Sequence, residues 1–166
     1  MYGKYCVAFF GHRNIEMENV RKVEECLEEL IEKLIKEKAY VEFLVGRNGD
    51  FDQCVSSTVR RTRKRCGEEN SDLILELPYL SAEYSRNEEF FYNYYTLVEV
   101  PYAASRAHPK AAIPIRNREM AERADLVICY IKRESGGAWK AVEYAKKQNK
   151  RVINVADMIR QGKEKS

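Results

Sequence analysis

Residues 5–13 read YCVAFFGHR, an unbroken apolar run that ends at Gly11 and is followed at once by His12 and Arg13. A short apolar run bounded by glycine is typical of a strand in a parallel sheet, because such a strand is covered on both faces. Further runs of this kind occur at residues 40–45, 72–77, 97–100, 126–131 and 151–155. The sequence therefore predicts a sheet of short, buried strands.

Amphipathic segments separate these runs and predict helices. Apolar residues repeat at helical spacing from Val20 to Ile35, with Glu and Lys on the opposite side. A second such segment extends from Phe51 to Cys66, and two more are expected at 116–123 and 138–147. Because strands alternate with helices, we predict an α/β fold of the Rossmann-like, doubly wound type. Its mostly parallel sheet would lie in a three-layer αβα arrangement, as a single domain over residues 1–160 with a polar tail at 161–166.

The composition limits the classes of protein that this chain can belong to. It has 166 residues, 29 basic and 26 acidic side chains and a net charge of +3. This length suits one domain on the usual scale of about 100 to 200 residues. With no apolar stretch of about 20 residues and no signal-peptide pattern, we expect a cytoplasmic protein without a membrane partner. The charge excess is too small to drive attachment to a polyanion, so we do not expect a nucleic-acid partner.

Cysteine and histidine usage argues against metal chemistry and structural disulfides. The five cysteines are an odd count without a CxxC pair, which is unlike a disulfide framework or a closed zinc site. Two histidines, His12 and His108, cannot assemble a histidine-based metal site. The chain also lacks the GxxxxGK[ST] pattern of a P-loop. We therefore expect neither a metal nor another cofactor.

The candidate ligand-binding residues lie where predicted strands end or begin. In an open parallel sheet, ligands bind beyond the carboxyl ends of the strands, where helix N-termini and free amides converge. Glycine lets a backbone approach a phosphate closely, and arginine matches its oxygens with a planar fork. The candidates are Gly11, His12, Arg13, Gly46, Asp50, Arg116, Asn117, Ser135, Gly136 and Gly137. We predict that they meet in one cleft that holds an anionic, nucleotide-like small molecule, although turns and helix starts would also explain the glycines.

Two further segments allow two interpretations each. The basic run from Arg60 to Arg65 could contact nucleic acid, but a solvated helix face gives the same pattern, and Glu68 and Glu69 follow at once. Residues 79–102 are rich in tyrosine and phenylalanine. These aromatics could stack on a base or form a lid. They could equally pack at a sheet edge or between the subunits of a homo-oligomer, and we favour packing or an interface.

Two blocks of the sequence carry a family resemblance. The segment FFGHR at 9–13 resembles the opening of the short YpsA-like branch of the SLOG superfamily. The block at 116–145, with RNREM at its start, GGA at 136–138 and YA at its end, is similar to the closing block of the same branch. The resemblance covers nearly the whole chain. It implies a SLOG-like Rossmann sheet and a pocket for a nucleotide or a nucleotide-derived ligand.

A more distant resemblance is to the cytokinin-activating phosphoribohydrolases, or LOG proteins, of the same superfamily. Their arginine and the glutamate of a GGxGTxxE motif serve cleavage of the N-glycosidic bond in a nucleoside monophosphate. Arg116 resembles that arginine, and Glu143 follows Gly137 at the LOG spacing. The resemblance therefore implies Arg116 and Glu143 as catalytic residues. Trp139 and Lys140 replace the Gly-Thr of the motif, which favours binding over turnover.

Three hypotheses follow for the function. The first is a ligand-binding or sensor domain for a nucleotide-like molecule, and the second is an N-glycosidic hydrolase that uses Arg116 and Glu143. A third and weaker one is a nucleic-acid-associated protein that works through residues 60–65, because the DNA-processing DprA proteins belong to the same superfamily. The sequence does not identify the ligand.

Overall fold

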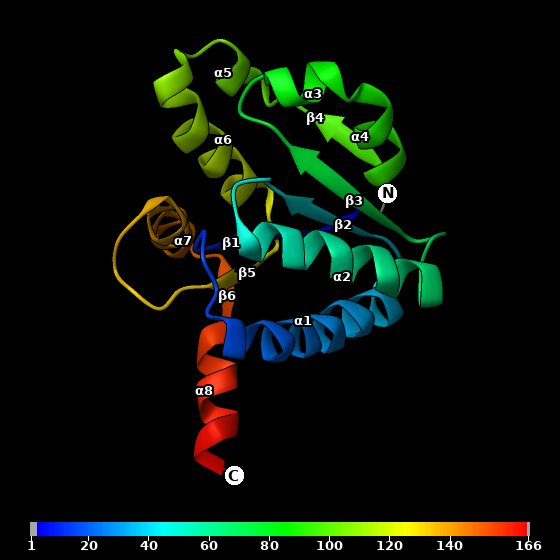
Figure 1. The fold of residues 1–166 in the computed structure, drawn as a ribbon, viewed down its shortest axis with the longest axis vertical. Helices are drawn as coiled ribbons and strands as arrows, with labels where there is room; N and C mark the ends of the chain where they lie inside the picture. The colour runs from blue at the N-terminus through cyan, green and yellow to red at the C-terminus, as the bar shows by residue number, and fades with distance from the viewer. Residues whose placement is uncertain (1–2, 166) are drawn as a thin grey trace.

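The computed structural model describes residues 3–165 and contains one parallel sheet (Figure 1). Within those residues the strands are β1 (Tyr5–Gly11), β2 (Val41–Val45), β3 (Ser71–Glu76), β4 (Leu97–Glu99), β5 (Leu126–Tyr130) and β6 (Arg151–Asn154). Their order in the sheet is β4-β3-β2-β1-β5-β6, and every neighbouring pair is parallel. The predicted Rossmann-like α/β fold is confirmed, and the sheet is parallel throughout.

The strand order changes direction between β1 and β5, which are neighbours in the sheet. Strands β2, β3 and β4 are laid down outward on one side of β1, whereas β5 and β6 extend the sheet on its other side. In the register of β1 and β5, Gly11 stands beside Tyr130, so the two strands end at the same level. Loops leave these strands in opposite directions at this point, which is where open α/β sheets form their ligand sites.

Helices cover both faces of the sheet and form the predicted three layers. One face carries α1 (Met17–Glu37), α2 (Asp50–Cys66) and α8 (Val155–Lys165), and the other carries α6 (Pro109–Arg123) and α7 (Gly137–Lys147). The short helices α3 (Ala82–Arg86) and α4 (Glu88–Tyr94) lie beside β3 and β4, and α5 (Tyr102–Ser105) packs against α6 (Figure 1).

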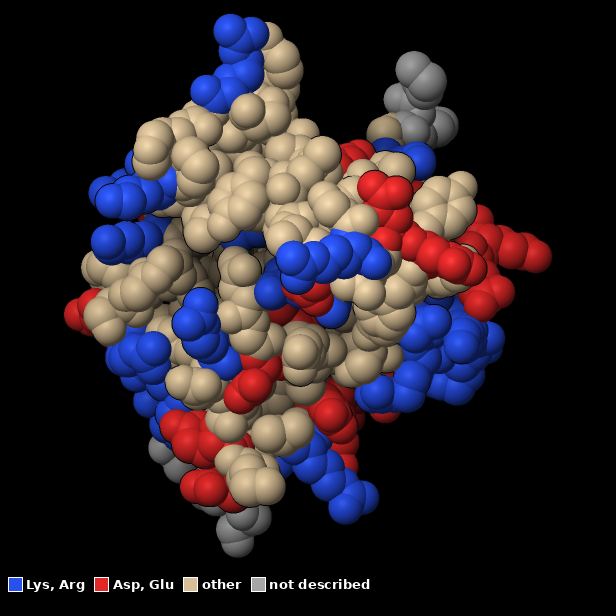
Figure 2. Space-filling model, turned by 45° about the horizontal axis from the view of Figure 1, so that its top comes forward, with Lys and Arg blue, Asp and Glu red and all other residues tan. Residues whose placement is uncertain are grey.

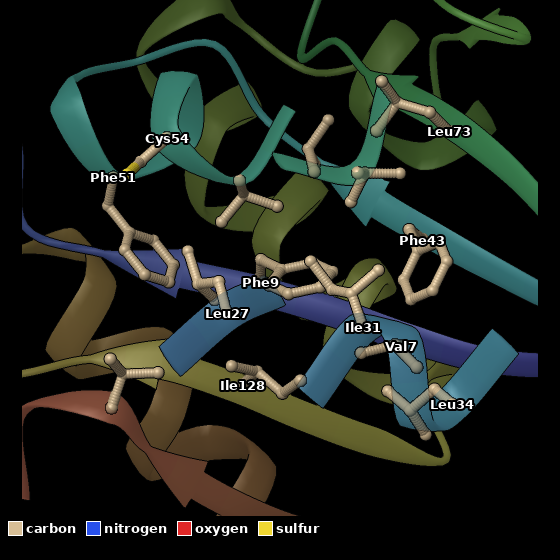
Figure 3. Packing of buried hydrophobic residues seen from close by; sticks show 14 of the residues in the cluster. Val7, Phe9, Leu27, Ile31, Leu34, Phe43, Phe51, Cys54, Leu73 and Ile128 are labelled. Atoms are coloured by element: carbon tan, nitrogen blue, oxygen red, sulfur yellow. The ribbon is translucent and has the colours of Figure 1, made fainter. Parts of the chain in front are cut away.

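The larger core lies between the sheet and α1 and α2. Leu27, Ile31 and Leu34 line one side of α1 and face the sheet, where Phe9 and Ile128 are fully buried (Figure 3). Burying one such side chain stabilises the fold by about 1.5 to 3 kcal/mol. The helical spacing of the apolar residues in α1 therefore reflects this contact directly.

The opposite face is packed with smaller side chains. Ala141, Val142 and Ala145 of α7 join one buried cluster with Ala8 of β1 and Val127 of β5. Small residues let the helix approach the sheet closely. This contact brings the first turn of α7 close to the carboxyl ends of β1 and β5.

Two element boundaries differ from the sequence prediction. Helix α6 begins at Pro109, where His108 Nδ1 accepts a hydrogen bond from the Lys110 amide at 3.2 Å. Pro114, which ordinarily marks a helix boundary, lies inside this helix, and for that reason the pattern placed its start too late. At the other end of the chain, residues 161–165 continue α8 instead of forming a separate polar tail.

All five cysteines are free thiols. Cys6, Cys54 and Cys129 are buried in the two cores, and burial raises the pKa of each thiol to about 12. They therefore act as small apolar side chains. Between residues 3 and 165, none of the helices is long and apolar enough to cross a membrane. The same residues contain no group of three or more His, Cys, Asp or Glu side chains that could hold a metal ion.

Candidate functional site

Eight of the ten predicted ligand-binding residues line one cleft at the carboxyl edge of the sheet, which we call the main cleft. Its volume is about 330 Å³. The predicted ligand-binding residues that line it are Gly11, His12, Arg13, Gly46, Arg116, Asn117, Gly136 and Gly137. They meet because β1, β2 and β5 end at the same edge, with α6 and α7 on the face beside it.

Arg116 is the most constrained group in the main cleft. Its side chain is only 2% exposed. Nη1 donates to the carbonyl oxygen of Glu76 at 2.8 Å, and Nε donates to Oδ1 of Asn117 at 2.9 Å. Nη2 makes no hydrogen bond to any of residues 3–165. Burial lowers the pKa of Arg116, but a guanidinium keeps its charge. The cleft therefore contains a fixed cation whose Nη2 group can still donate hydrogen bonds to a ligand.

The loop after β2 fits tightly against Arg116. A Cβ atom on Gly46 would lie 3.1 Å from Oδ2 of Asp52 and 3.5 Å from Nη1 of Arg116. Asp52 Oδ2 accepts a hydrogen bond from the Asn48 amide at 2.8 Å. Burial raises the pKa of the Asp52 carboxyl, while that amide and the charge of Arg116 oppose the rise. A side chain at position 46 would therefore need the Asp52 carboxyl to move by a few tenths of an ångström, whereas its contact with Arg116 would be an ordinary van der Waals contact.

The first turn of α7 forms the wall of the main cleft opposite this loop. Gly136 has a φ of 92°, a left-handed conformation that glycine adopts without strain. Among residues 3–165 no side chain caps the start of α7, and Gly136, Gly137 and Ala138 all line the cleft. The free amides and the positive end of the helix dipole favour an anion here.

His12 lines the main cleft and also has a structural role. Its side chain is 4% exposed, and Nε2 accepts hydrogen bonds from the amides of Lys132 at 2.9 Å and Arg133 at 3.3 Å. Burial lowers the pKa of His12, which keeps the imidazole neutral and Nε2 able to accept. The histidine thus holds the loop after β5 in place. Contact between His12 and a ligand stays a prediction.

That loop contributes a cleft residue that sequence reasoning missed. Arg133 lines the main cleft together with Arg13, and its backbone is held by His12. The signal that could have found it is an arginine in the loop between a strand and a glycine pair. Arg13, Arg116 and Arg133 give the main cleft three guanidinium groups against the single carboxyl of Asp52.

Other predicted residues lie outside the main cleft. Asp50 Oδ2 accepts a hydrogen bond from the Ile15 amide at 3.0 Å and so fastens the loop after β1. Ser135 is exposed and does not line the cleft. Glu143 pairs with Lys146 at 3.4 Å and lines two neighbouring hollows on either side of α7. The structure therefore does not bring Arg116 and Glu143 into one cleft.

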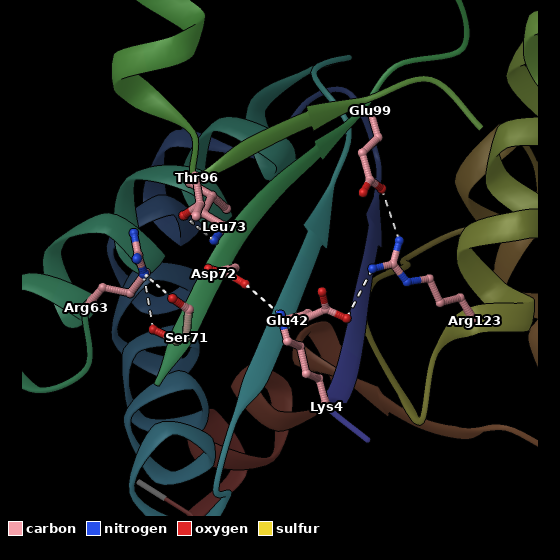
Figure 4. Close-up of polar contacts among 9 residues, drawn as sticks. All are labelled: Lys4, Glu42, Arg63, Ser71, Asp72, Leu73, Thr96, Glu99 and Arg123. Atoms are coloured by element: carbon pink, nitrogen blue, oxygen red, sulfur yellow. Dashed lines mark hydrogen bonds and ion pairs between the residues drawn. The ribbon is translucent and has the colours of Figure 1, made fainter. Parts of the chain in front are cut away.

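A cluster of carboxylates surrounds Arg123, which lies on the same helix as Arg116. Arg123 of α6 pairs with Glu42 at 3.1 Å, with Glu76 at 3.2 Å and with Glu99 at 3.1 Å, and Figure 4 shows its bonds to Glu42 and Glu99. Glu76 is 3% exposed. Burial and the neighbouring Glu99 raise the pKa of Glu76 well above its ordinary range, whereas hydrogen bonding lowers that of Glu99. Glu76 therefore keeps its proton to a higher pH than Glu99 does, and the backbone carbonyl of the same Glu76 holds Arg116.

Comparison with known proteins identifies the fold. No family model and no curated protein matches this sequence. The structure is similar to the X-ray structure of DNA processing protein A (DprA) from Streptococcus pneumoniae, with a TM-score of 0.62 and 16% identity over 90% of this chain. It is also similar to DprA from Helicobacter pylori, with a TM-score of 0.59 and 15% identity over 89% of this chain. These matches span 49% and 63% of the two DprA chains, so this chain corresponds to part of each.

The comparison corrects one expectation from the sequence. We did not expect a nucleic-acid partner, because the net charge is only +3. The Helicobacter pylori protein shares this fold, and its structure describes a mode of binding single-stranded DNA. The expectation was wrong because net charge averages over the whole surface, whereas binding depends on where the charges are placed.

Proposed function

We propose that the main cleft binds the phosphate group of a nucleotide or a nucleotide-derived molecule. One observation carries the proposal: the buried guanidinium of Arg116, with Nη2 lacking a partner among residues 3–165, lines the same cleft as the uncapped start of α7. Charge-assisted bonds from a fixed guanidinium and from helix amides are the usual means of holding a phosphate.

The size and lining of the main cleft suit a nucleotide better than a bare anion. Ligand sites generally measure about 300 to 1,000 Å³, and this cleft lies at the lower end of that range. Phe10, Ile113 and Met120 add apolar surface for a sugar or a ring. The resemblance of the sequence to the SLOG superfamily supports the same ligand class, and we propose that the chain is a member of that superfamily.

Isothermal titration with nucleoside monophosphates and the matching nucleosides tests this proposal. We expect each monophosphate to bind at least tenfold more tightly than its nucleoside, because charge-assisted hydrogen bonds contribute about 1.5 to 3 kcal/mol. Inorganic phosphate should compete with the monophosphate. Equal affinity for the phosphorylated and unphosphorylated compounds would contradict a phosphate site.

Incubating the protein with the same nucleoside monophosphates also tests the hydrolase hypothesis. Turnover of a nucleoside monophosphate requires a free carboxylate beside the scissile bond. Glu143 lies outside the main cleft and is paired with Lys146 at 3.4 Å, and Asp52, which lines the cleft, accepts a hydrogen bond from the Asn48 amide. We therefore expect no release of free base when the reaction is followed by chromatography. Base release that disappears in Glu143→Gln, with ligand affinity kept, would support the enzyme over the binding protein.

A second candidate function is binding of single-stranded DNA, which a surface on α2 and α4 favours. The Arg60 guanidinium lies 4.1 Å from the centroid of the Tyr94 ring, and Tyr94 stacks on the exposed Phe90 at 5.5 Å. Arg61 and Lys64 are exposed on the same helix as Arg60 (Figure 2, where blue side chains gather over the end of α2). Basic groups interleaved with aromatic rings are typical of surfaces that bind single strands.

We expect the double variant Arg61→Ala, Lys64→Ala to weaken binding of an oligothymidylate. If both side chains contact phosphates, the slope of log affinity against log salt should fall by roughly 1.4, at about 0.7 per phosphate on single strands. The matched control is Lys22→Ala, Lys33→Ala, which removes the same charge from exposed positions on α1. Gel shifts over a range of salt concentrations measure both. Equal loss in the two double variants would assign the effect to net charge alone.

A further inference from the structure

A second hollow lies beside the main cleft, between α7 and α8, and we call it the α7–α8 hollow. Its volume is about 430 Å³. Arg133 lines both cavities, and Trp139 of the hollow follows directly after Gly137 and Ala138 of the main cleft. Arg133 and the first turn of α7 therefore lie between the two cavities, and a nucleotide that occupies both must cross this turn.

Aromatic and aliphatic side chains form much of the wall of the α7–α8 hollow. They are Tyr130, Ile131, Trp139, Val142, Ala156 and Ile159. The base of the hollow is rigid, because Asn154 Oδ1 accepts hydrogen bonds from the amides of Ile131 and Ala156, each at 3.1 Å. Such a wall suits a flat ring more than a hydrated anion.

The charged residues of the hollow are mostly neutralised within the chain. Lys146 pairs with Glu143 at 3.4 Å, and Arg160 pairs with Asp157 at 3.3 Å. Lys132 likewise pairs with Glu16 at 3.2 Å. The hollow therefore differs from the main cleft, where guanidinium groups outnumber carboxyls.

Asn19 contributes an acceptor that lacks a partner. Its side chain lines the hollow and is 7% exposed. Nδ2 donates to Oε2 of Glu16 at 3.2 Å, and the Tyr130 hydroxyl donates to the same oxygen at 3.1 Å. These bonds fix the amide, because turning it over would place Oδ1 against the carboxylate. Oδ1 has almost no exposed surface and accepts no hydrogen bond from any of residues 3–165, so a ligand N–H that reaches it through a small shift of the covering side chains would supply the missing partner.

We infer that the α7–α8 hollow binds the base of the nucleotide whose phosphate occupies the main cleft, with Trp139 as the stacking surface and Asn19 Oδ1 as the acceptor for an N–H of the base. The inference rests on the proposed function and extends it to the choice of base. It assigns Trp139 and Asn19 a role in specificity, on the opposite side of the α7 start from Arg116. A base with an exocyclic amino group, such as adenine, satisfies both residues.

The fluorescence of Trp139 tests the inference directly, since it is the only tryptophan in the chain. Titration with adenosine monophosphate should change its emission with the same dissociation constant that calorimetry gives. Inorganic phosphate should bind without changing the emission. Trp139→Ala should weaken binding of the nucleotide by about tenfold or more and leave the affinity for inorganic phosphate unchanged, because stacking acts on the base alone.

Two further variants separate stacking from general effects. Trp139→Phe keeps a ring and should retain most of the affinity, and Tyr92→Ala removes an exposed aromatic side chain from α4 and should have no effect. Asn19→Ala should abolish the preference for adenosine monophosphate over purine riboside monophosphate, which lacks the amino group.

The outcomes distinguish this inference from the proposed function. If nucleotides bind by calorimetry while the emission of Trp139 and the affinity of Trp139→Ala do not change, the base lies elsewhere and the inference is wrong, although the phosphate site stands. If neither nucleotides nor inorganic phosphate bind, the proposed function fails and the inference fails with it.

Discussion

Arg116→Ala is expected to weaken binding of a nucleoside monophosphate by roughly 10- to 100-fold, which corresponds to the 1.5 to 3 kcal/mol of a hydrogen bond to a charged group. The guanidinium is held by the Glu76 carbonyl and by Asn117, so it meets the ligand without further loss of side-chain entropy. Isothermal titration of the parent protein and the variant measures the effect.

Because Arg116 is buried, its removal also affects the fold, and the controls must separate the two effects. Truncation leaves the carbonyl oxygen of Glu76 without this donor, so the melting temperature of Arg116→Ala should fall as well. Arg116→Lys keeps the charge but not the planar fork, and its affinity should lie between those of the parent and Arg116→Ala. Arg118→Ala removes the same charge from an exposed position on α6 and should bind like the parent. Equal losses in Arg118→Ala and Arg116→Ala would exclude a specific phosphate contact.

Glu76→Gln is expected to stabilise the protein at mildly alkaline pH and to leave its stability nearly unchanged at mildly acidic pH. The pKa of Glu76 is raised in the folded state by burial and by Glu99, so the folded protein binds this proton more tightly than the unfolded chain does. Stability must therefore fall as the pH rises from the ordinary glutamate pKa of about 4.3 toward the raised value. Glutamine cannot ionise and removes this loss.

The size of the effect follows from the linkage between pKa and stability. Each unit of pKa difference corresponds to about 1.4 kcal/mol, and each kcal/mol shifts the melting temperature of a domain of this size by about 2 to 4 °C. We expect Glu76→Gln to melt several degrees above the parent at alkaline pH. Glu99 contributes in the opposite direction, since its lowered pKa adds stability that is lost only as the pH falls below the ordinary glutamate range.

Thermal melts of both proteins from mildly acidic to mildly alkaline pH measure this dependence. Glu68→Gln is the matched control, because Glu68 is exposed and forms no ion pair within residues 3–165. It should follow the parent at every pH. A parent protein whose melting temperature rises toward alkaline pH, with Glu76→Gln less stable throughout, would show that Glu76 is ionised in the fold and acts as a partner of Arg123.

Much of the candidate site could be predicted from where strands end. The loops after β1 and β2 and the glycine pair at the start of α7 were identified because parallel strands place their carboxyl ends at one edge. Arg133 was missed because the exposed charges of Lys132 and Glu134 flank it, although its place between a strand and a glycine pair was a usable signal. Glu143 was chosen by its resemblance to a motif, yet its place on α7 turns it toward the hollows beside the main cleft.

The sequence by itself determined the strands, the main helices and the edge of the sheet where ligands bind, because burial imposes a periodicity that is visible over a few residues. Only the tertiary structure decided what each polar side chain does. The Asp50 carboxylate accepts a hydrogen bond from the Ile15 amide, and Nε2 of His12 accepts one from the loop after β5. The Glu76 carbonyl accepts one from Arg116. Each of these hydrogen bonds joins groups far apart in the sequence. A hydrogen bond depends on the distance and angle between its two groups in the folded chain, and the order of the residues carries no pattern that records them.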